Sequence, residues 1–189
     1  TVYGIVASRT LRPLWVLEEL ELEFEQVPID FKGKGAKTSE MLALNPNGHI
    51  PILRDGEVVL WESMAINLYL AERYGAGRLW PVELPDHGRC YQWSFWVMSE
   101  VERWALQVLH HRSASPEESR DPTQLKQAEG ALRAPLDVLE GALEGRAYLL
   151  GEPFSIADLN VAAVLNWVRI ARMDLGRWPR VADWLERCV

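Results

Sequence analysis

The spacing of the apolar residues changes along the chain and separates two kinds of structure. Residues 2–7 form a short apolar run typical of a buried strand, and from Leu11 to Leu20 the apolar positions recur at helical spacing. Residues 24–31 alternate as a second strand does. Asp55-Gly56, a strong hairpin signal, separates short strands expected at 51–54 and 57–60, and residues 62–74 predict a helix ended by Gly75.

The order strand-helix-strand, loop, strand-strand-helix predicts an α/β domain over residues 1–79. A strand-helix-strand start implies a right-handed crossover and parallel pairing, whereas the hairpin adds antiparallel strands. The expected result is a mixed four-stranded sheet covered by helices.

No strand pattern is found in the second half of the chain. The segment 80–86 contains Pro81 and Pro85 and predicts a linker. Helical patterns then cover about 87–111, 121–144, 156–171 and 179–188, and Pro135 is expected to kink the second of these. Residues 87–189 therefore predict an all-helical domain.

Composition and charge narrow the function classes. The 189 residues carry a formal charge of −7 without a basic run, which disfavours nucleic acid and an anionic membrane surface as partners. No apolar run reaches the roughly 18 residues of a spanning helix, and the first residues lack signal-peptide features. Cys90 and Cys188 form no metal-like cluster, so we expect free thiols, a cytoplasmic protein and no metal site.

The segment Gly48-His49-Ile50-Pro51 is the first candidate for chemistry. If the Ile50-Pro51 bond is cis, the backbone N–H and C=O of Ile50 face outward, and a peptide ligand can pair with them as an added strand does. Taken alone, the segment is explained more simply by a trans proline at the start of a strand.

Two strand-to-helix junctions offer further candidates. At Glu62-Ser63 the free N–H groups of a helix start can hold a ligand carboxylate, Ser63 adds a hydroxyl, and Glu62 can accept an ammonium. At Ser8-Arg9-Thr10 a hydroxyl can donate to a thiolate, whose pKa the helix would lower from about 8.5. Helix capping without any ligand is the alternative at both junctions.

The pattern of residues 154–159 indicates a role in structure and not in ligand binding. Ser155 and Asp158 fit a capping box, with Asp in the place of the usual Glu or Gln, and Phe154 and Leu159 fit a hydrophobic staple. The segment therefore predicts the start of a buried helix inside the second domain.

Together these segments resemble the cytosolic glutathione S-transferase family, of the bacterial type with a serine/threonine-like active site. The matching segments are 17–20, 45–53, 62–66 and 148–158, in the family's order and spacing over nearly the whole chain. The resemblance implies a thioredoxin-like first domain and an all-helical second domain. It also implies a cis Pro51, with Ile50 pairing to the cysteinyl backbone of glutathione, Glu62 and Ser63 at its γ-glutamyl end and His49 at its glycyl carboxylate.

The same resemblance implies the activity. Ser8 falls where serine-type relatives keep the hydroxyl that activates the thiol, with Thr10 and Arg9 as the other candidates. The expected reaction is conjugation of the glutathione thiolate to a small, apolar electrophile, with glutathione as cosubstrate, no metal and a homodimeric assembly. Isomerase, peroxidase, reductase or dehalogenase activity, or a non-catalytic binding role, are the alternatives. Candidates for the electrophile site on the first helix of the second domain are Trp96, Arg103 and Trp104.

Overall fold

Four short strands form one mixed sheet in the first part of the chain. The computed structural model describes all residues 1–189 and divides them into the units Thr1–Val82 and Glu83–Val189. In the sheet order β2-β1-β3-β4, β1 (Val2–Tyr3) pairs parallel with β2 (Gln26–Val27) and antiparallel with β3 (Ile52–Asp55), which pairs antiparallel with β4 (Val58–Trp61). The predicted mixed four-stranded sheet is confirmed.

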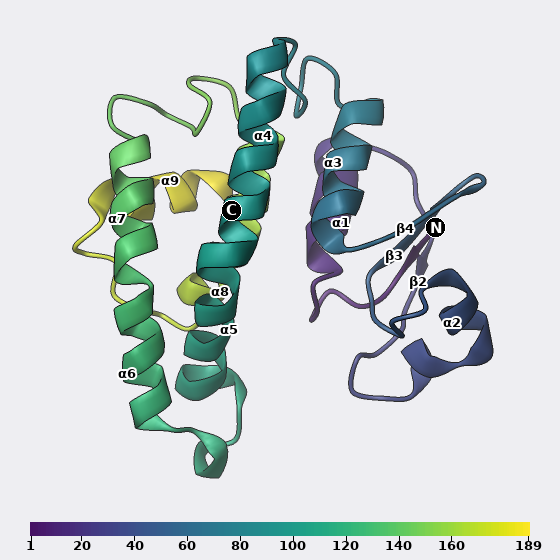
Figure 1. The fold of residues 1–189 in the computed structure, drawn as a ribbon, viewed down its shortest axis with the longest axis horizontal. Coiled ribbons are helices and arrows are strands. Elements are labelled where there is room, and N and C mark those ends of the chain that lie inside the picture. Colours follow the sequence, from purple (N-terminus) through teal and green to yellow (C-terminus); the bar gives the residue numbers. More distant parts are fainter. The chain divides into compact units, whose positions relative to one another are not determined.

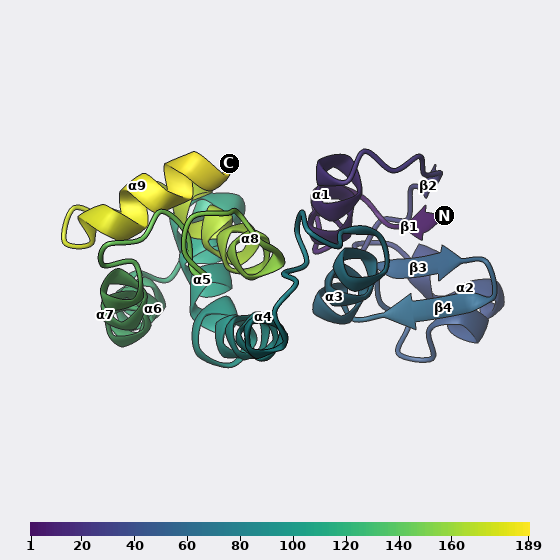
Figure 2. The same cartoon turned by 90° about the horizontal axis from the view of Figure 1, so that it is seen from above.

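Helices cover both faces of this sheet. α1 (Leu11–Glu19) and α3 (Ser63–Tyr74) lie together on one side, and α2 (Ser39–Leu44), which follows the short 3₁₀ turn η1 (Gly35–Lys37), lies on the other (Figures 1 and 2). The core between them is apolar and includes Val2, Leu17, Ile52, Ile66 and Leu70, each at most 5% exposed. This layering is that of a thioredoxin-like domain, as expected.

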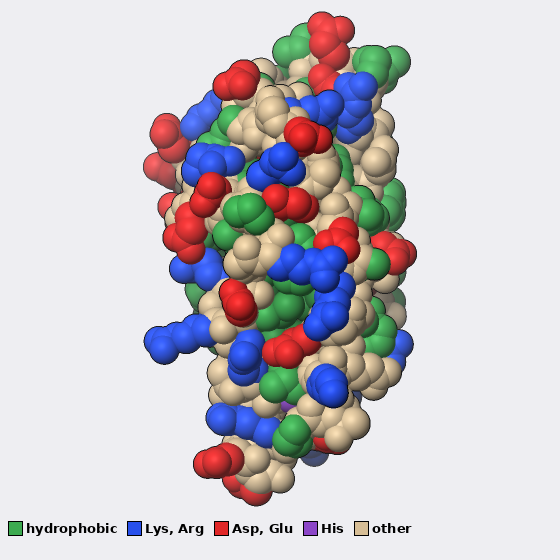
Figure 3. Space-filling model, turned by 90° about the vertical axis from the view of Figure 1, so that its left-hand side faces the viewer, with side chains coloured by type: hydrophobic (Ala, Val, Ile, Leu, Met, Phe, Trp, Pro, Cys, Tyr) green, Lys and Arg blue, Asp and Glu red, His purple; other side chains and the backbone are tan.

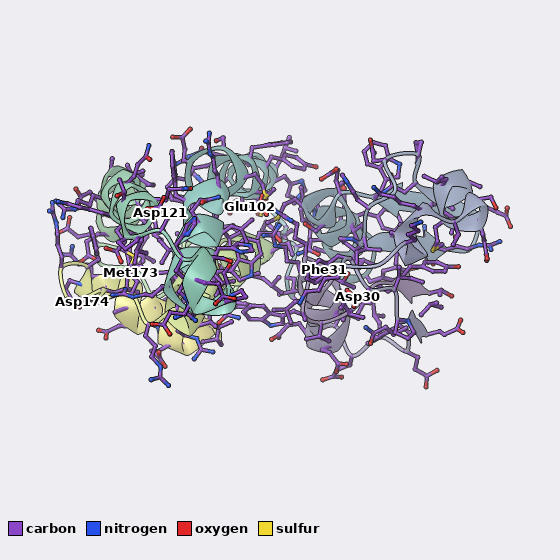
Figure 4. The ribbon with its side chains drawn as sticks, turned by 90° about the horizontal axis from the view of Figure 1, so that it is seen from below. Asp30, Phe31, Glu102, Asp121, Met173 and Asp174 are labelled. Carbon is purple, nitrogen blue, oxygen red and sulfur yellow. The ribbon has the colours of Figure 1, made fainter.

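The first two strands are shorter than their apolar patterns predict. Gly4 has a φ of +136°, so the chain turns away from the sheet directly after Tyr3. Pro28 follows Val27 and has no N–H to donate to a ladder, which ends β2 there. The expectation of a strand over 24–31 is therefore wrong at both ends, and Asp30 and Phe31 lie in the loop after β2 (Figure 4).

The second unit consists of helices, as predicted. Its first long stretch is α4 (Leu84–Trp96), a π-helical turn η2 (Val97–Val101), α5 (Glu102–Leu109) and a second π-helical turn η3 (His110–Ala114). α4 begins within the segment 80–86, for which the sequence predicts a linker. The remaining elements are a 3₁₀ turn η4 (Glu117–Ser119), α6 (Pro122–Ala131), α7 (Arg133–Ala142), α8 (Ile156–Ile170) and α9 (Pro179–Cys188). No helix in the structure has both the length and the apolar character that crossing a membrane requires.

The expected kink at Pro135 is a break between two helices. α6 ends at Ala131 and α7 begins at Arg133. Pro135 has no N–H to donate to the carbonyl four residues earlier, which belongs to Ala131, so the helical ladder is interrupted at that place.

α8 is the central helix of the second unit and contacts α4, α5 and α9. It is apolar almost all round, as a fully buried helix is expected to be. The capping box predicted at its start is confirmed, because the backbone N–H of Asp158 donates to the Ser155 side chain and the backbone N–H of Ser155 donates to Oδ2 of Asp158 at 3.1 Å. The Ser155 hydroxyl also donates to Oδ2, at 2.8 Å. Oδ1 of Asp158 accepts from the N–H of Leu149 at 2.7 Å and from Nε1 of Trp184 at 3.0 Å.

One face of this unit is charged. Lys and Arg side chains alternate there with Asp and Glu side chains (Figure 3). Two ion pairs join the α7 region to the start of α9. Arg177, just before α9, pairs with Asp137 of α7 at 3.2 Å, and Arg180 of α9 pairs with Glu144, just after α7, at 3.2 Å.

Candidate active site

The strand register brings the three candidate segments of the first unit to the same edge of the sheet. Ile52 lies opposite Tyr3 on one side and opposite Trp61 on the other. β1 ends with Tyr3, β3 begins with Ile52 and β4 ends with Trp61, so Gly4, Pro51 and Glu62 lie just beyond this row at the same end of the sheet. The loop before α1, the turn before β3 and the start of α3 therefore meet at one end of the sheet.

The turn before β3 exposes unpaired backbone. The Ile50-Pro51 peptide bond is cis, as the resemblance implies. Buried Asn45 holds this turn, because its Nδ2 donates to the carbonyl of His49 at 2.8 Å and its Oδ1 accepts from the N–H of Asn47 at 3.0 Å. The N–H and C=O of Ile50 form no hydrogen bond within the chain, so an extended ligand can pair with them.

The start of α3 combines positive charge with unfilled hydrogen-bonding groups. No side chain caps the helix, so its first N–H groups are available to a ligand. The Arg12 guanidinium, only 1% exposed, donates from Nη1 to Oγ of Ser63 at 3.0 Å, and this leaves the Ser63 hydroxyl hydrogen to be donated. A buried cation and a helix N-terminus together favour an anionic group at this place.

Glu62 stands beside this anion site in a conformation that side chains rarely adopt. Its φ of 72° and ψ of 112° lie outside the regions favoured by non-glycine residues, and its side chain is exposed. Such outliers cluster at ligand sites, where the surrounding structure holds them. An α-amino acid group carries both an ammonium and a carboxylate. The Glu62 carboxylate suits the ammonium, and the neighbouring anion site suits the carboxylate.

The loop before α1 contains the three candidates for activating the thiol, which differ in their exposure to solvent. Thr10 is fully buried, and it packs so closely on Gly4 that a Cβ on Gly4 would lie 2.0 Å from Thr10 Oγ1. Ser8 is half-buried; its hydroxyl lies 2.7 Å from the Ile5 carbonyl and 2.9 Å from Thr10 Oγ1. Arg9 is exposed. Of the two residues, Thr10 is buried, so only the Ser8 hydroxyl is accessible to a ligand. The Thr10 hydroxyl lies within hydrogen-bonding distance of the Ser8 hydroxyl on its buried side.

Sequence reasoning missed two residues that shape this edge. Arg12 is a charge inside the apolar run of α1, and its burial against Ser63 is the reason for that position. Asn45 enters the sequence prediction only as part of the segment 45–53, although its side chain orients His49, the residue that precedes Ile50. A single charge within an apolar helical face was the available signal for Arg12.

The residues predicted for an electrophile site all lie in the second unit. Trp96, at the end of α4, and Trp104, in α5, are half-buried, and the exposed Arg103 guanidinium lies 4.9 Å from the Trp104 ring centroid. Trp96 also packs edge-to-face on Trp93 at 5.0 Å. Their role in binding an electrophile stays a prediction.

The two cysteines are poor nucleophiles. Both are free and buried within the second unit. Burial, with a smaller effect of the Asp158 carboxylate, raises the pKa of Cys90 to about 12 and also raises the pKa of Cys188. Both thiols are therefore protonated near neutral pH, and neither suits thiolate chemistry.

Known proteins define the class to which this fold and site belong. The family model described as "Glutathione S-transferase, N-terminal domain" matches residues 1–72, and "Glutathione S-transferase, C-terminal domain" matches residues 90–189. Glutathione S-transferase GstB of Escherichia coli is 31% identical over 94% of this chain and 90% of its own. Disulfide-bond oxidoreductase YfcG of the same organism is 33% identical over 90% of this chain and 81% of its own.

A solved structure agrees with these sequences. The theta class glutathione S-transferase of Xanthomonas axonopodis pv. citri, solved with glutathione bound, has a TM-score of 0.90 and 27% identity, over 98% of this chain and 90% of that one. The chain belongs to the glutathione S-transferase family.

Proposed function

We propose that this transferase binds glutathione at the edge of its sheet and conjugates the thiol to a small electrophile. The observation that carries the proposal is the presence of three features at one end of the sheet. These are the free backbone of Ile50 beside the cis Pro51, the uncapped start of α3 at Glu62-Ser63, and the Ser8 hydroxyl.

Each part of glutathione has a matching group in this arrangement. The γ-glutamyl carboxylate would accept from the first N–H groups of α3 and from Ser63, with Arg12 behind, while Glu62 takes the ammonium. The cysteinyl backbone would pair with Ile50, as an added strand does. Exposed His49, next along the turn, is our candidate for the glycyl carboxylate.

Ser8 is the candidate that activates the thiol. Its hydroxyl donates to the Ile5 carbonyl at 2.7 Å in the structure and would turn to donate to the sulfur instead. It would then stabilise the thiolate, supported by the dipole of the nearby start of α1. The sulfur electron pair then forms a bond to an electrophilic carbon. In a displacement the leaving group departs with its bonding electrons; in an addition the resulting carbanion takes up a proton.

A conjugation role fits this chain better than one based on a protein thiol. Ser8 occupies the loop where a cysteine would be needed, and Cys90 and Cys188 are buried with raised pKa values. The nucleophile is therefore expected to come from the cosubstrate. Trp96, Trp104 and Arg103 are the proposed contacts of an apolar electrophile.

Thiol titration of bound glutathione tests the role of Ser8. We expect Ser8→Ala to raise the pKa of the bound thiol and to lower kcat/KM about 10- to 100-fold, because the thiolate loses a charge-assisted hydrogen bond worth about 1.5–3 kcal/mol. Ser119→Ala, at an exposed serine in η4, is the matched control and should leave both values unchanged. Equal thiol pKa values in wild type and Ser8→Ala would remove Ser8 from this role.

Calorimetric titration with glutathione tests the binding site separately. Glu62→Gln keeps the size of the side chain but removes the charge opposite the ammonium, so affinity should fall severalfold while the chemical step is retained. Unchanged affinity would show that the γ-glutamyl group is held elsewhere.

We also propose that the protein acts as a homodimer in the cytoplasm. Leu84, Tyr91 and Phe95 are exposed and lie seven and four residues apart, which places them on one face of α4. Such an apolar stripe is a candidate contact between subunits. Light scattering on wild type and Phe95→Glu should show a dimer and a weakened dimer, and a monomeric wild type would reject this assembly. Cell fractionation tests the location, and recovery outside the cytoplasmic fraction would reject it.

A further inference from the structure

A pocket lies within the helical unit, between the residues that follow α7 and one face of α9. It has a volume of about 410 Å³. Four charged side chains line it: Arg146, Arg180, Asp183 and Arg187. The three from α9 are spaced by three and four residues and so share one face of that helix.

The guanidinium groups in this pocket have few partners. Arg187 donates from Nη2 to the Ala147 carbonyl at 2.9 Å, and Arg146 donates weakly from Nη1 to the Leu149 carbonyl at 3.5 Å. Neither forms an ion pair with a carboxylate, whereas Arg180 pairs with Glu140 at 3.7 Å and Glu144 at 3.2 Å. Since a guanidinium has five N–H donors, Arg146 and Arg187 keep most of theirs free.

We propose that this pocket binds the phosphate group of a small phosphate monoester. Planar guanidinium forks match phosphate oxygens in a bidentate manner. Arg180 is balanced by Glu140 and Glu144, so the charge available to a ligand comes from Arg146 and Arg187, with Asp183 as the one carboxylate in the lining. The carbonyls of Ala147 and Leu149, in the loop after α7, accept from one donor on each of Arg187 and Arg146, but these contacts do not explain why three arginines line one cavity.

Asp183 limits the kind of ligand. Its carboxylate forms no ion pair and lies three residues after Arg180 and four before Arg187 on α9. It would repel a bare phosphate but can accept hydrogen bonds from hydroxyl groups on the rest of a ligand. The pocket is also larger than a phosphate ion needs, so a phosphorylated polyol is the class of ligand that suits it.

Calorimetric titration at low salt with glycerol 3-phosphate and with inorganic phosphate tests this proposal. We expect saturable binding of glycerol 3-phosphate to the whole protein, weakened about tenfold or more in the double variant Arg146→Gln/Arg187→Gln, because charge-assisted hydrogen bonds are lost. Arg177→Gln is the matched control, since Arg177 is exposed but paired with Asp137 outside the pocket lining, and it should bind like wild type.

Two further variants keep the test decisive. Asp183→Asn should tighten inorganic phosphate and reduce the preference for glycerol 3-phosphate over it. If the double variant does not fold, Arg146→Gln alone replaces it, because the Arg146 side chain is exposed. Absence of saturable binding, or equal affinity in wild type and the folded arginine variants, would overturn the proposal. So would an equal loss in Arg177→Gln, which would indicate a general charge effect.

Discussion

Replacing Asp158 by Asn should destabilise the helical unit although the side chain keeps its shape. The buried carboxylate accepts four hydrogen bonds, two on each oxygen, from Leu149, Trp184 and Ser155. An amide has only one acceptor oxygen, so its NH₂ group must face two of the donors. Each buried donor left without an acceptor costs about 1–3 kcal/mol, which gives about 2–6 kcal/mol in total.

Relief of a buried charge offsets part of this loss. Burial raises the pKa of Asp158, and the hydrogen bonds from Leu149, Trp184 and Ser155 oppose that rise. We therefore expect a net loss of about 2–4 kcal/mol for Asp158→Asn, a large fraction of the roughly 5–15 kcal/mol that stabilises a typical domain. Asp158→Ala, which leaves all four donors without an acceptor, should cost more.

Equilibrium urea unfolding followed by tryptophan fluorescence measures these differences. Glu186→Gln, at an exposed site on α9, is the control and should change the free energy of unfolding little. A folded Asp158→Asn protein as stable as wild type would refute the reasoning, because it would mean that the four donors do not depend on the carboxylate.

The pH dependence of the same comparison has a definite sign. Because the folded-state pKa of Asp158 is raised above its ordinary value of 3.8, the contribution of this group to stability is greatest below that pH. It declines as pH rises through the folded-state pKa. The difference in free energy of unfolding between wild type and Asp158→Asn should therefore shrink over that window.

Three other substitutions or reagents test separate features. Gly4→Ala should destabilise the first unit by about 2 kcal/mol or more in urea, because a side chain at a φ of +136° is strained and would collide with Thr10. Glu62→Gly should raise stability by about 1 kcal/mol, as a strained φ of 72° is relieved, while glutathione affinity measured by calorimetry falls. Cys90 should resist alkylation near neutral pH until urea unfolds the chain, and fast labelling of the folded protein would contradict its raised pKa of about 12.

Local signals were sufficient for much of the fold. The Asp55-Gly56 hairpin and the capping box at Ser155 involve residues close in sequence, so their chemistry can be read without the tertiary structure. The helical unit was likewise predictable from apolar periodicity. The break before Pro135 followed from the missing N–H of a single residue.

Features set by distant contacts could not be predicted in the same way. The π-helical turns η2 and η3 leave no periodic signal that distinguishes them from an α-helix. The burial of Arg12 depends on Ser63, which lies 51 residues further along the chain. The difference in exposure between Ser8 and Thr10 depends on the tertiary structure, and alternation and spacing alone could not reveal it.

The ligand site depends on correct strand pairing in the first unit, through the row formed by Tyr3, Ile52 and Trp61. Slipping any of these strands by one residue would turn its side chains to the opposite face and shift the segments that follow the row relative to one another. An incompletely paired sheet is therefore expected to have little affinity for the tripeptide. By mass action, the cosubstrate then acts as a selective stabiliser of correctly assembled chains, adding about 2.7 kcal/mol when its concentration is a hundred times the dissociation constant. The cellular concentration of glutathione would in that case influence the lifetime of the folded protein as well as its catalytic rate.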